Sequence, residues 1–210
     1  MKKRILCFGD SNTWGYIGGT GERYDEDTRW TCRLQRLLGD DFVVIEEGHN
    51  GRTTVWDDPV ENRLAGLTYL WPCMDSQSPF DLIIIMVGSN DTKVYFNVNA
   101  RSIAESAGRL VDLAASSDFG PGRSHPKVLL VSPPRIYYNE TIAHAFGQQA
   151  ADKSAKFADE YRAVAREKGC FFMDAAAFAE PGEVDGLHLS AGSHERLAQA
   201  FYEKIMEILG

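Results

Sequence analysis

The sequence offers few of the features that mark a specialised class of protein. It contains only 4 cysteines, and their positions lack the short spacings typical of disulfide frameworks or metal sites. We expect reduced thiols, with Cys7 and Cys170 packed in the core because both lie in apolar runs. A redox or nucleophilic role is the alternative. The other two cysteines are Cys32 and Cys73.

Long apolar and basic stretches are also missing. No apolar run approaches the roughly 20 residues of a membrane helix. The one basic cluster, residues 2–4, precedes an apolar stretch of about five residues, which is too short for a secretion signal. Lysine and arginine total 22 against 30 acidic residues, a net charge of −8, and this balance repels nucleic acid and anionic membranes. We therefore expect a cytoplasmic protein that has neither as a partner.

What the chain does contain is a regular alternation of strand and helix patterns. Its 210 residues suit a single domain, residues 1–210. Apolar, β-rich runs cover residues 4–8, 42–46, 82–87, 128–132 and 170–174. They are continuous rather than alternating, which favours parallel strands covered on both faces. Helical patterns cover residues 29–38, 101–115, 152–168 and 191–209. This order predicts a doubly wound α/β sandwich with a five-stranded parallel sheet.

One serine lies at a position that favours nucleophilic chemistry. Ser11 belongs to the segment FGDSN, residues 8–12, directly after the first predicted strand. A serine between a strand and a helix is held on a tight turn at the carboxyl edge of the sheet. It needs a base and a carboxylate that orients the base. We expect His188 to be the base and Asp185, three residues earlier, to hold its ring.

The other histidines are weaker candidates. We interpret His194, just inside the last helix, as a solvated residue, and His49 as a spectator at the rim of the site. His125 and His144 look like loop positions.

Three groups could stabilise an oxyanion, because each follows a predicted strand. They are the Ser11 amide, the backbone N–H of Gly51 and the carboxamide of Asn90. Each of the last two has an ordinary interpretation: Asn90 as a turn residue that bonds its own backbone, and Gly51 as a turn position with positive φ. Because both residues are expected at the same edge of the sheet as Ser11, we favour their role in an oxyanion site.

Two connections, residues 50–79 and 133–151, are long and rich in aromatic residues. Such loops wall a pocket, form a subunit contact or pack against the surface. Four residues flank the motifs and are candidate pocket residues, with ordinary packing as the alternative: Trp14, Lys93, Tyr95 and Leu187.

Together these motifs resemble the GDSL lipase/esterase family, the SGNH hydrolases. Ser11 matches the motif serine, Gly51 the oxyanion glycine and Asn90 the asparagine of the Gly-x-Asn-Asp block, while Asp185 and His188 match the Asp-x-x-His block. The blocks follow the family order across nearly the whole chain. The resemblance implies a flavodoxin-like, three-layer α/β/α fold and a Ser-His-Asp esterase that needs no metal or cofactor.

A closer likeness concerns the bacterial arylesterase/acyltransferase group, which the segments at residues 4–11, 52–54, 90–93 and 131–134 resemble. It implies hydrolysis of short-chain acyl esters, transfer of the acyl group to alcohols or peroxide in some members, and a homo-oligomer. Asn12 departs from the family pattern, which has leucine there. Two other functions stay open: a carbohydrate O-deacetylase, and a non-enzymatic flavodoxin-like module that binds phosphate at residues 9–13.

Overall fold

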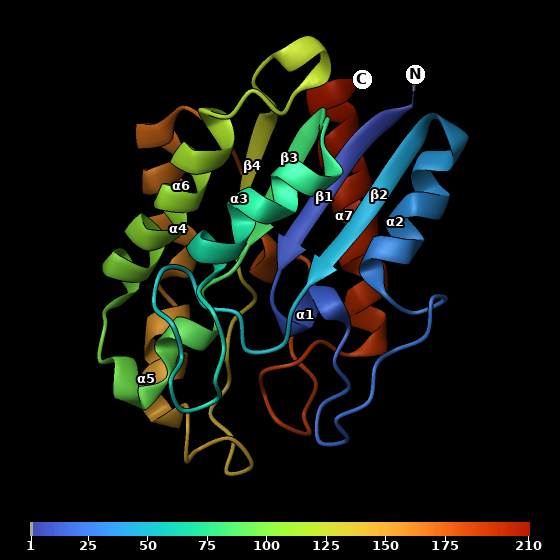
Figure 1. The fold of residues 1–210 in the computed structure, drawn as a ribbon. Coiled ribbons are helices and arrows are strands. Elements are labelled where there is room, and N and C mark those ends of the chain that lie inside the picture. Colours follow the sequence, from blue (N-terminus) through green and yellow to red (C-terminus); the bar gives the residue numbers. More distant parts are fainter. Residues whose placement is uncertain (1) are drawn as a thin grey trace.

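Five parallel strands form one sheet in the order β2-β1-β3-β4-β5, as the strand patterns predict. The computed structural model describes residues 2–210. The strands are β1 (Lys3–Gly9), β2 (Phe42–Gly48), β3 (Leu82–Met86), β4 (Lys127–Ser132) and β5 (Phe171–Asp174). In Figure 1 strands β1 and β2 point toward the end of the molecule where the short helix α1 (Ser11–Trp14) lies, and the other strands run parallel to them.

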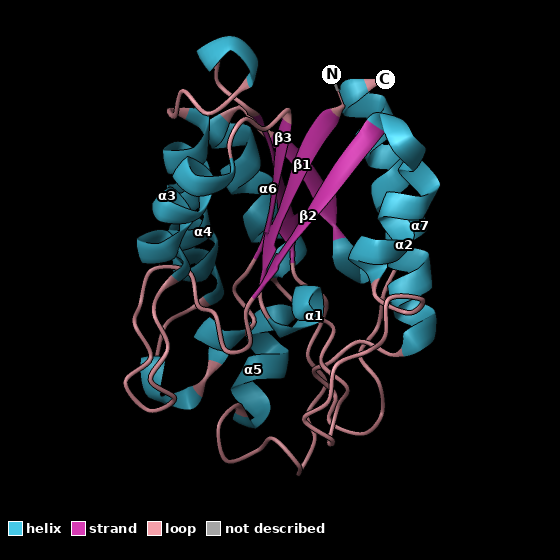
Figure 2. Cartoon of the chain, turned by 45° about the vertical axis from the view of Figure 1, so that its right-hand side comes forward, coloured by secondary structure: helices cyan, strands magenta, loops and turns pink. Residues whose placement is uncertain are grey.

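Helices cover both faces of the sheet, which Figure 2 shows nearly edge-on. One face carries α2 (Trp30–Leu38) and α7 (Ala191–Leu209). The other carries α3 (Gly66–Gln77), α4 (Ala100–Ala115) and α6 (Phe157–Lys168). This is the three-layer α/β/α arrangement.

Each strand contributes to two separate cores. In β1, Leu6 and Phe8 pack toward α3 and α4, whereas Ile5 and Cys7 pack toward α2 and α7. All four side chains are at most 1% exposed. Because neither face of the sheet meets water, the strands carry uninterrupted apolar runs.

Strands β1, β2 and β3 end at the same level. Gly9, the last residue of β1, pairs with Gly48 on one side and with Met86 on the other. The segments that follow β1, β2 and β3 therefore leave the sheet side by side at its carboxyl edge.

The structure corrects some of the predicted helix boundaries. The pattern at residues 152–168 is two helices, α5 (Gly147–Ser154) and α6. The break follows Ser154, whose side chain accepts a hydrogen bond from the Ile136 N–H at 2.9 Å. Helix α3 lies inside the connection at residues 50–79 and was not predicted. It contains Pro72, which the sequence pattern treats as a helix breaker.

The four cysteines carry free thiols. Cys7 is buried in β1, and Cys170 is half-buried just before β5. Burial raises the pKa of the Cys170 thiol to about 11, so it is protonated near neutral pH. Separately, none of the helices between residues 2 and 210 combines the length and the apolar character that spanning a bilayer requires.

Candidate active site

Ser11 is the first residue of α1, immediately beyond the end of β1. The turn is tight: a Cβ atom at Gly9 would lie 2.0 Å from the Thr13 hydroxyl oxygen, so only glycine fits there. Asp10 caps the helix by accepting a hydrogen bond from the Asn12 N–H at 3.0 Å. Ser11 is only 7% exposed, and its hydroxyl is held at the carboxyl edge of the sheet.

The structure brings Ser11 together with the two C-terminal residues that the sequence singled out. His188 Nε2 lies 3.0 Å from Ser11 Oγ, and His188 Nδ1 lies 2.7 Å from Asp185 Oδ2. The other Asp185 oxygen accepts the backbone N–H groups of Leu187 and His188, both at 2.9 Å. The loop before α7 is thereby folded around the carboxylate.

Asp185 is ionised under ordinary conditions. Burial raises the pKa of its carboxyl group, but hydrogen bonds from His188 outweigh this effect and hold the pKa below its usual value. An ionised carboxylate accepts a hydrogen bond from His188 Nδ1–H, which leaves Nε2 free to accept one from the Ser11 hydroxyl.

Sequence reasoning missed two residues that pack on this pair from the loop after α1. The Tyr16 ring lies over the His188 imidazole with centroids 4.2 Å apart. Gly18 lies so close to Asp185 that a Cβ atom would be 2.7 Å from Oδ2. No spacing rule links residues 16–18 to residues 185–188, so the sequence carried no signal for either contact.

The turn that contains Gly51 is fastened to the end of β1. The His49 N–H and the Arg52 guanidinium both donate to the Gly9 carbonyl oxygen, at 3.1 and 2.9 Å. Gly51 itself has φ +80°, a conformation that favours glycine. Among the hydrogen bonds within residues 2–210, none uses the N–H of Ser11 or Gly51. Both donors are thus available at this edge.

Asn90 begins the short turn η2 (Asn90–Thr92) after β3. Its Nδ2 donates to the Arg52 carbonyl oxygen at 3.1 Å, which joins it to the Gly51 turn and leaves its second N–H unused. The next residue adds a second link between the turn after β3 and the segment that follows Gly51: the buried Asp91 carboxylate accepts a hydrogen bond from the Thr54 N–H at 2.9 Å. Burial raises the pKa of Asp91 to about 6.

The candidate pocket residues fall into three groups. Lys93 is buried, and its ammonium lies 2.9 Å from Asp58 and 2.6 Å from Glu61. The Tyr95 hydroxyl donates to the same Asp58 oxygen at 2.7 Å. Asp58 lies in a long loop beside other acidic residues, Asp57 and Glu61, so nothing in the sequence singled it out.

The other two candidates lie in separate clusters. The Arg23 guanidinium lies over the Trp14 ring, with its central carbon 5.2 Å from the ring centroid. Leu187 packs with Ile136 and Phe146.

The prediction that His194 is solvated is wrong. Its side chain is fully buried, and Nδ1 accepts the Trp30 N–H at 3.3 Å. Within residues 2–210, Nε2 has no hydrogen-bond partner. Burial lowers the His194 pKa to about 4. The first turn of α7 packs against the start of α2, a contact that the sequence alone does not show.

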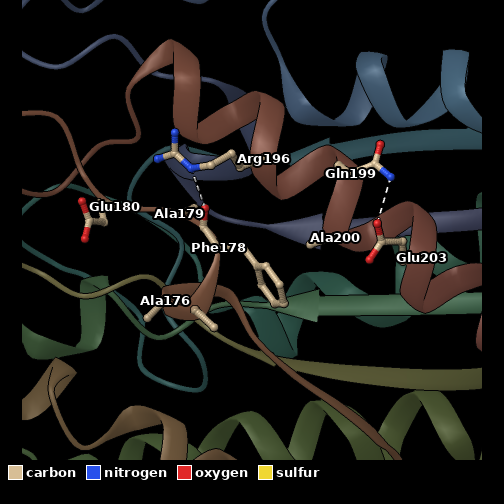
Figure 3. Close-up of a pocket in the computed structure, with 9 residues that line it drawn as sticks. Ala176, Phe178, Ala179, Glu180, Arg196, Gln199, Ala200 and Glu203 are labelled. Carbon is tan, nitrogen blue, oxygen red and sulfur yellow. Dashed lines mark hydrogen bonds between the residues drawn. The ribbon is translucent and has the colours of Figure 1, made fainter.

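A cavity of about 620 Å³ lies elsewhere on the molecule, between α7 and the short turn η5 (Ala175–Ala177). Figure 3 shows Phe178 and Arg196 on its walls. Ser11, Asp185 and His188 are not among its lining residues. In the part of the chain that the structure describes, no group of three or more histidine, cysteine or acidic side chains is placed to hold a metal ion.

A sequence model of the GDSL-like lipase/acylhydrolase family matches residues 7–196. The chain belongs to this family. As a GDSL-like hydrolase it is a carboxylic ester hydrolase, and this favours an enzyme over the phosphate-binding module. No curated protein matches its sequence at a significant level.

Solved structures with the same fold include esterases of two kinds. The inhibitor-bound aryl esterase of M. smegmatis is 39% identical with a TM-score of 0.93, over 99% of this chain and 100% of its own. A carbohydrate acetylesterase from Sinorhizobium meliloti is 37% identical with a TM-score of 0.93, over the same shares. A putative arylesterase from Agrobacterium tumefaciens str. C58 is 32% identical with a TM-score of 0.90, again over 99% and 100%.

Proposed function

We propose that this GDSL-like hydrolase is a serine esterase that cleaves short-chain acyl esters, acetyl and aryl esters among them. The observation that carries the proposal is the chain of contacts from Ser11 Oγ to His188 Nε2, 3.0 Å, and from His188 Nδ1 to Asp185 Oδ2, 2.7 Å. These distances are within reach of direct proton transfer between nucleophile and base.

In the first step, Ser11 Oγ attacks the ester carbonyl while its proton moves to His188 Nε2. Asp185 accepts the Nδ1–H and stabilises the imidazolium. The carbonyl oxygen becomes an oxyanion, to which Ser11 N–H, Gly51 N–H and Asn90 Nδ2 donate. The bond to the leaving oxygen then breaks, His188 returns the proton to that oxygen, and an alcohol departs from acyl-Ser11.

In the second step, His188 removes a proton from water, and the resulting nucleophile attacks the acyl carbon. The bond between the acyl carbon and Ser11 Oγ then breaks as His188 returns its proton to that oxygen, which releases a carboxylic acid and regenerates Ser11. An alcohol or peroxide in place of water yields an ester or a peracid instead. We propose this acyl transfer as a second outcome of the same site, on the strength of the likeness to the arylesterase/acyltransferase group.

A p-nitrophenyl ester series of increasing acyl length tests the proposal on the wild-type protein and on Ser11→Ala. We expect turnover of the acetyl ester by the wild type, a fall as the acyl chain lengthens, and no turnover above background by Ser11→Ala. Undiminished turnover by Ser11→Ala would refute the assignment of the nucleophile.

The second candidate is a carbohydrate O-deacetylase, which the likeness to the Sinorhizobium meliloti acetylesterase supports. It uses the same three residues and differs in the alcohol that leaves. Aryl acetates and acetylated sugars, compared in one assay by kcat/KM, decide between the two: a clear preference for the sugars favours the deacetylase.

We also propose that residues 1–210 act as one domain and assemble as a homo-oligomer. The likeness to the arylesterase group supports assembly, and so do the half-exposed Tyr137 and Tyr138 rings, which apolar contact with a second copy would cover. Light scattering of the purified protein measures the oligomeric state. A mass equal to that of one 23.4 kDa chain would contradict the proposal.

A further inference from the structure

Asn12 occupies the position next to Ser11 where the family pattern has leucine. Its side chain is buried, 2% exposed, and reaches the loop that carries His188. Nδ2 donates to the Leu187 carbonyl oxygen at 3.3 Å, and Oδ1 accepts the Leu189 N–H at 3.0 Å. These two hydrogen bonds engage the backbone on either side of His188.

The backbone of Asn12 is itself held by the scaffold. Its backbone N–H donates to the Asp10 carboxylate at 3.0 Å, and its backbone carbonyl oxygen accepts the Trp30 indole N–H at 3.1 Å. Trp30 is fully buried and stacks on Phe201 of α7. Asn12 therefore fixes the His188 loop relative to β1, α1 and α7.

A leucine at position 12 has nearly the same size but offers no donor and no acceptor. The Leu187 carbonyl and the Leu189 N–H would lose their partner in a buried region, which is unfavourable. The imidazole would then keep its contacts with Asp185 and Tyr16 but lose the anchoring of the backbone on either side of it. Small displacements of a reacting group reduce turnover by up to about 10²-fold.

We propose that Asn12 is a positioning residue, which holds the His188 imidazole in line with the Ser11 hydroxyl by hydrogen bonding to the backbone of residues 187 and 189. The inference rests on the proposed function and deepens it. Asn12 does not contact the substrate; it acts through His188.

The test is a double-mutant cycle on p-nitrophenyl acetate turnover with wild type, Asn12→Leu, His188→Ala and the double variant. In the wild-type background we expect Asn12→Leu to lower kcat by about tenfold or more and to leave KM within about twofold, because the placement of His188 matters most during proton transfer. In the His188→Ala background we expect no further loss, because residues that act as one unit are not additive. Equal losses in both backgrounds would overturn the proposal.

Two further variants separate alignment from general destabilisation. Ser117→Ala removes a buried hydroxyl that donates to Ala114 at 2.7 Å, beyond the end of α4 and at the opposite edge of the sheet. We expect it to lower the melting temperature while kcat is unchanged. Asn12→Asp keeps the side-chain shape but sets a carboxylate oxygen against the Leu187 carbonyl. We expect it to fold and to lower kcat only where His188 is present; full kcat in folded Asn12→Asp overturns the proposal.

The Ser11→Ala variant separates the proposed esterase function from the proposed role of Asn12. If Ser11→Ala is as active as the wild type, the proposed function fails and the role of Asn12 fails with it. If Ser11→Ala is inactive and Asn12→Leu retains full kcat, the esterase assignment stands and only the role of Asn12 is refuted.

Discussion

Asn90 uses one side-chain N–H to bind the Arg52 carbonyl oxygen, and the other is the one that we propose as an oxyanion donor. We expect Asn90→Ala to lower kcat by about 10²–10³-fold, the usual cost of one oxyanion donor, with the fold retained. Steady-state kinetics on p-nitrophenyl acetate, with circular dichroism for the fold, measure both effects. Asn99→Ala, the same change at the exposed residue that caps α4, is the control and should keep wild-type kcat. A folded Asn90→Ala variant with near-normal turnover would contradict the assigned role.

At the scale of single residues, the sequence predicted what a local motif can show. Ser11 follows a strand, and Asp185 lies three residues before His188, so both signals are contained in short segments. The bonds from Asn12 to the His188 loop span 175 and 177 residues. No spacing rule covers such a distance, and the burial of His194 likewise depends on how α7 meets α2.

At the scale of elements, the buried Lys93 ammonium ties the turn after β3 to the loop at residues 57–63. Lys93 and Asp58 side chains are 1% and 0% exposed. We expect Lys93→Met to reduce the free energy of unfolding by about 3 kcal/mol, because it leaves a buried carboxylate without its cation. Urea unfolding measures this.

The matched control for this change is Lys204→Met on α7, whose partner Glu207 is exposed. A surface pair contributes at most about 1 kcal/mol, so this variant should unfold close to the wild type. The double variant Lys93→Met/Asp58→Leu removes both buried charges and should recover part of the lost stability. Equal stability of Lys93→Met and the wild type would show that the pair contributes nothing.

The elements that the sequence predicted well are those with a strong apolar pattern. All five strands and helices α2, α4 and α7 were found to within about two residues, the usual uncertainty of helix ends. Helix α3 was missed because Pro72 lies inside it. Helices α5 and α6 were merged because the side-chain bond from Ser154 to Ile136, which accompanies their separation, is a tertiary contact.

At the scale of the whole molecule, His194 links stability to pH. Its pKa is about 4 in the folded protein, below the ordinary 6.5. The unfolded chain therefore binds a proton that the folded protein does not, and stability is lost as the pH falls from 6.5 toward 4. The full loss is about 3 kcal/mol. Urea unfolding between pH 8 and pH 4.5 measures most of this loss.

His194→Asn isolates this contribution, because asparagine offers an acceptor for the Trp30 N–H and does not titrate. We expect its stability to fall less than that of the wild type over the same pH range. The pKa of Asp91, raised to about 6, acts in the opposite direction, since the folded protein then binds the extra proton. It is present in both proteins and cancels in the comparison. Parallel pH profiles would contradict the assignment to His194.

The residues proposed to react come from distant parts of the chain: Ser11 follows the first strand, and His188 precedes the last helix. Their meeting requires that β1 is in the sheet and that α7 has docked. Hydrolysis of an ester is therefore a sensitive reporter of complete folding. During refolding from urea, the circular dichroism of helices and strands should recover before esterase activity does. The length of this lag would measure how long the two ends of the chain take to bring Ser11 and His188 together.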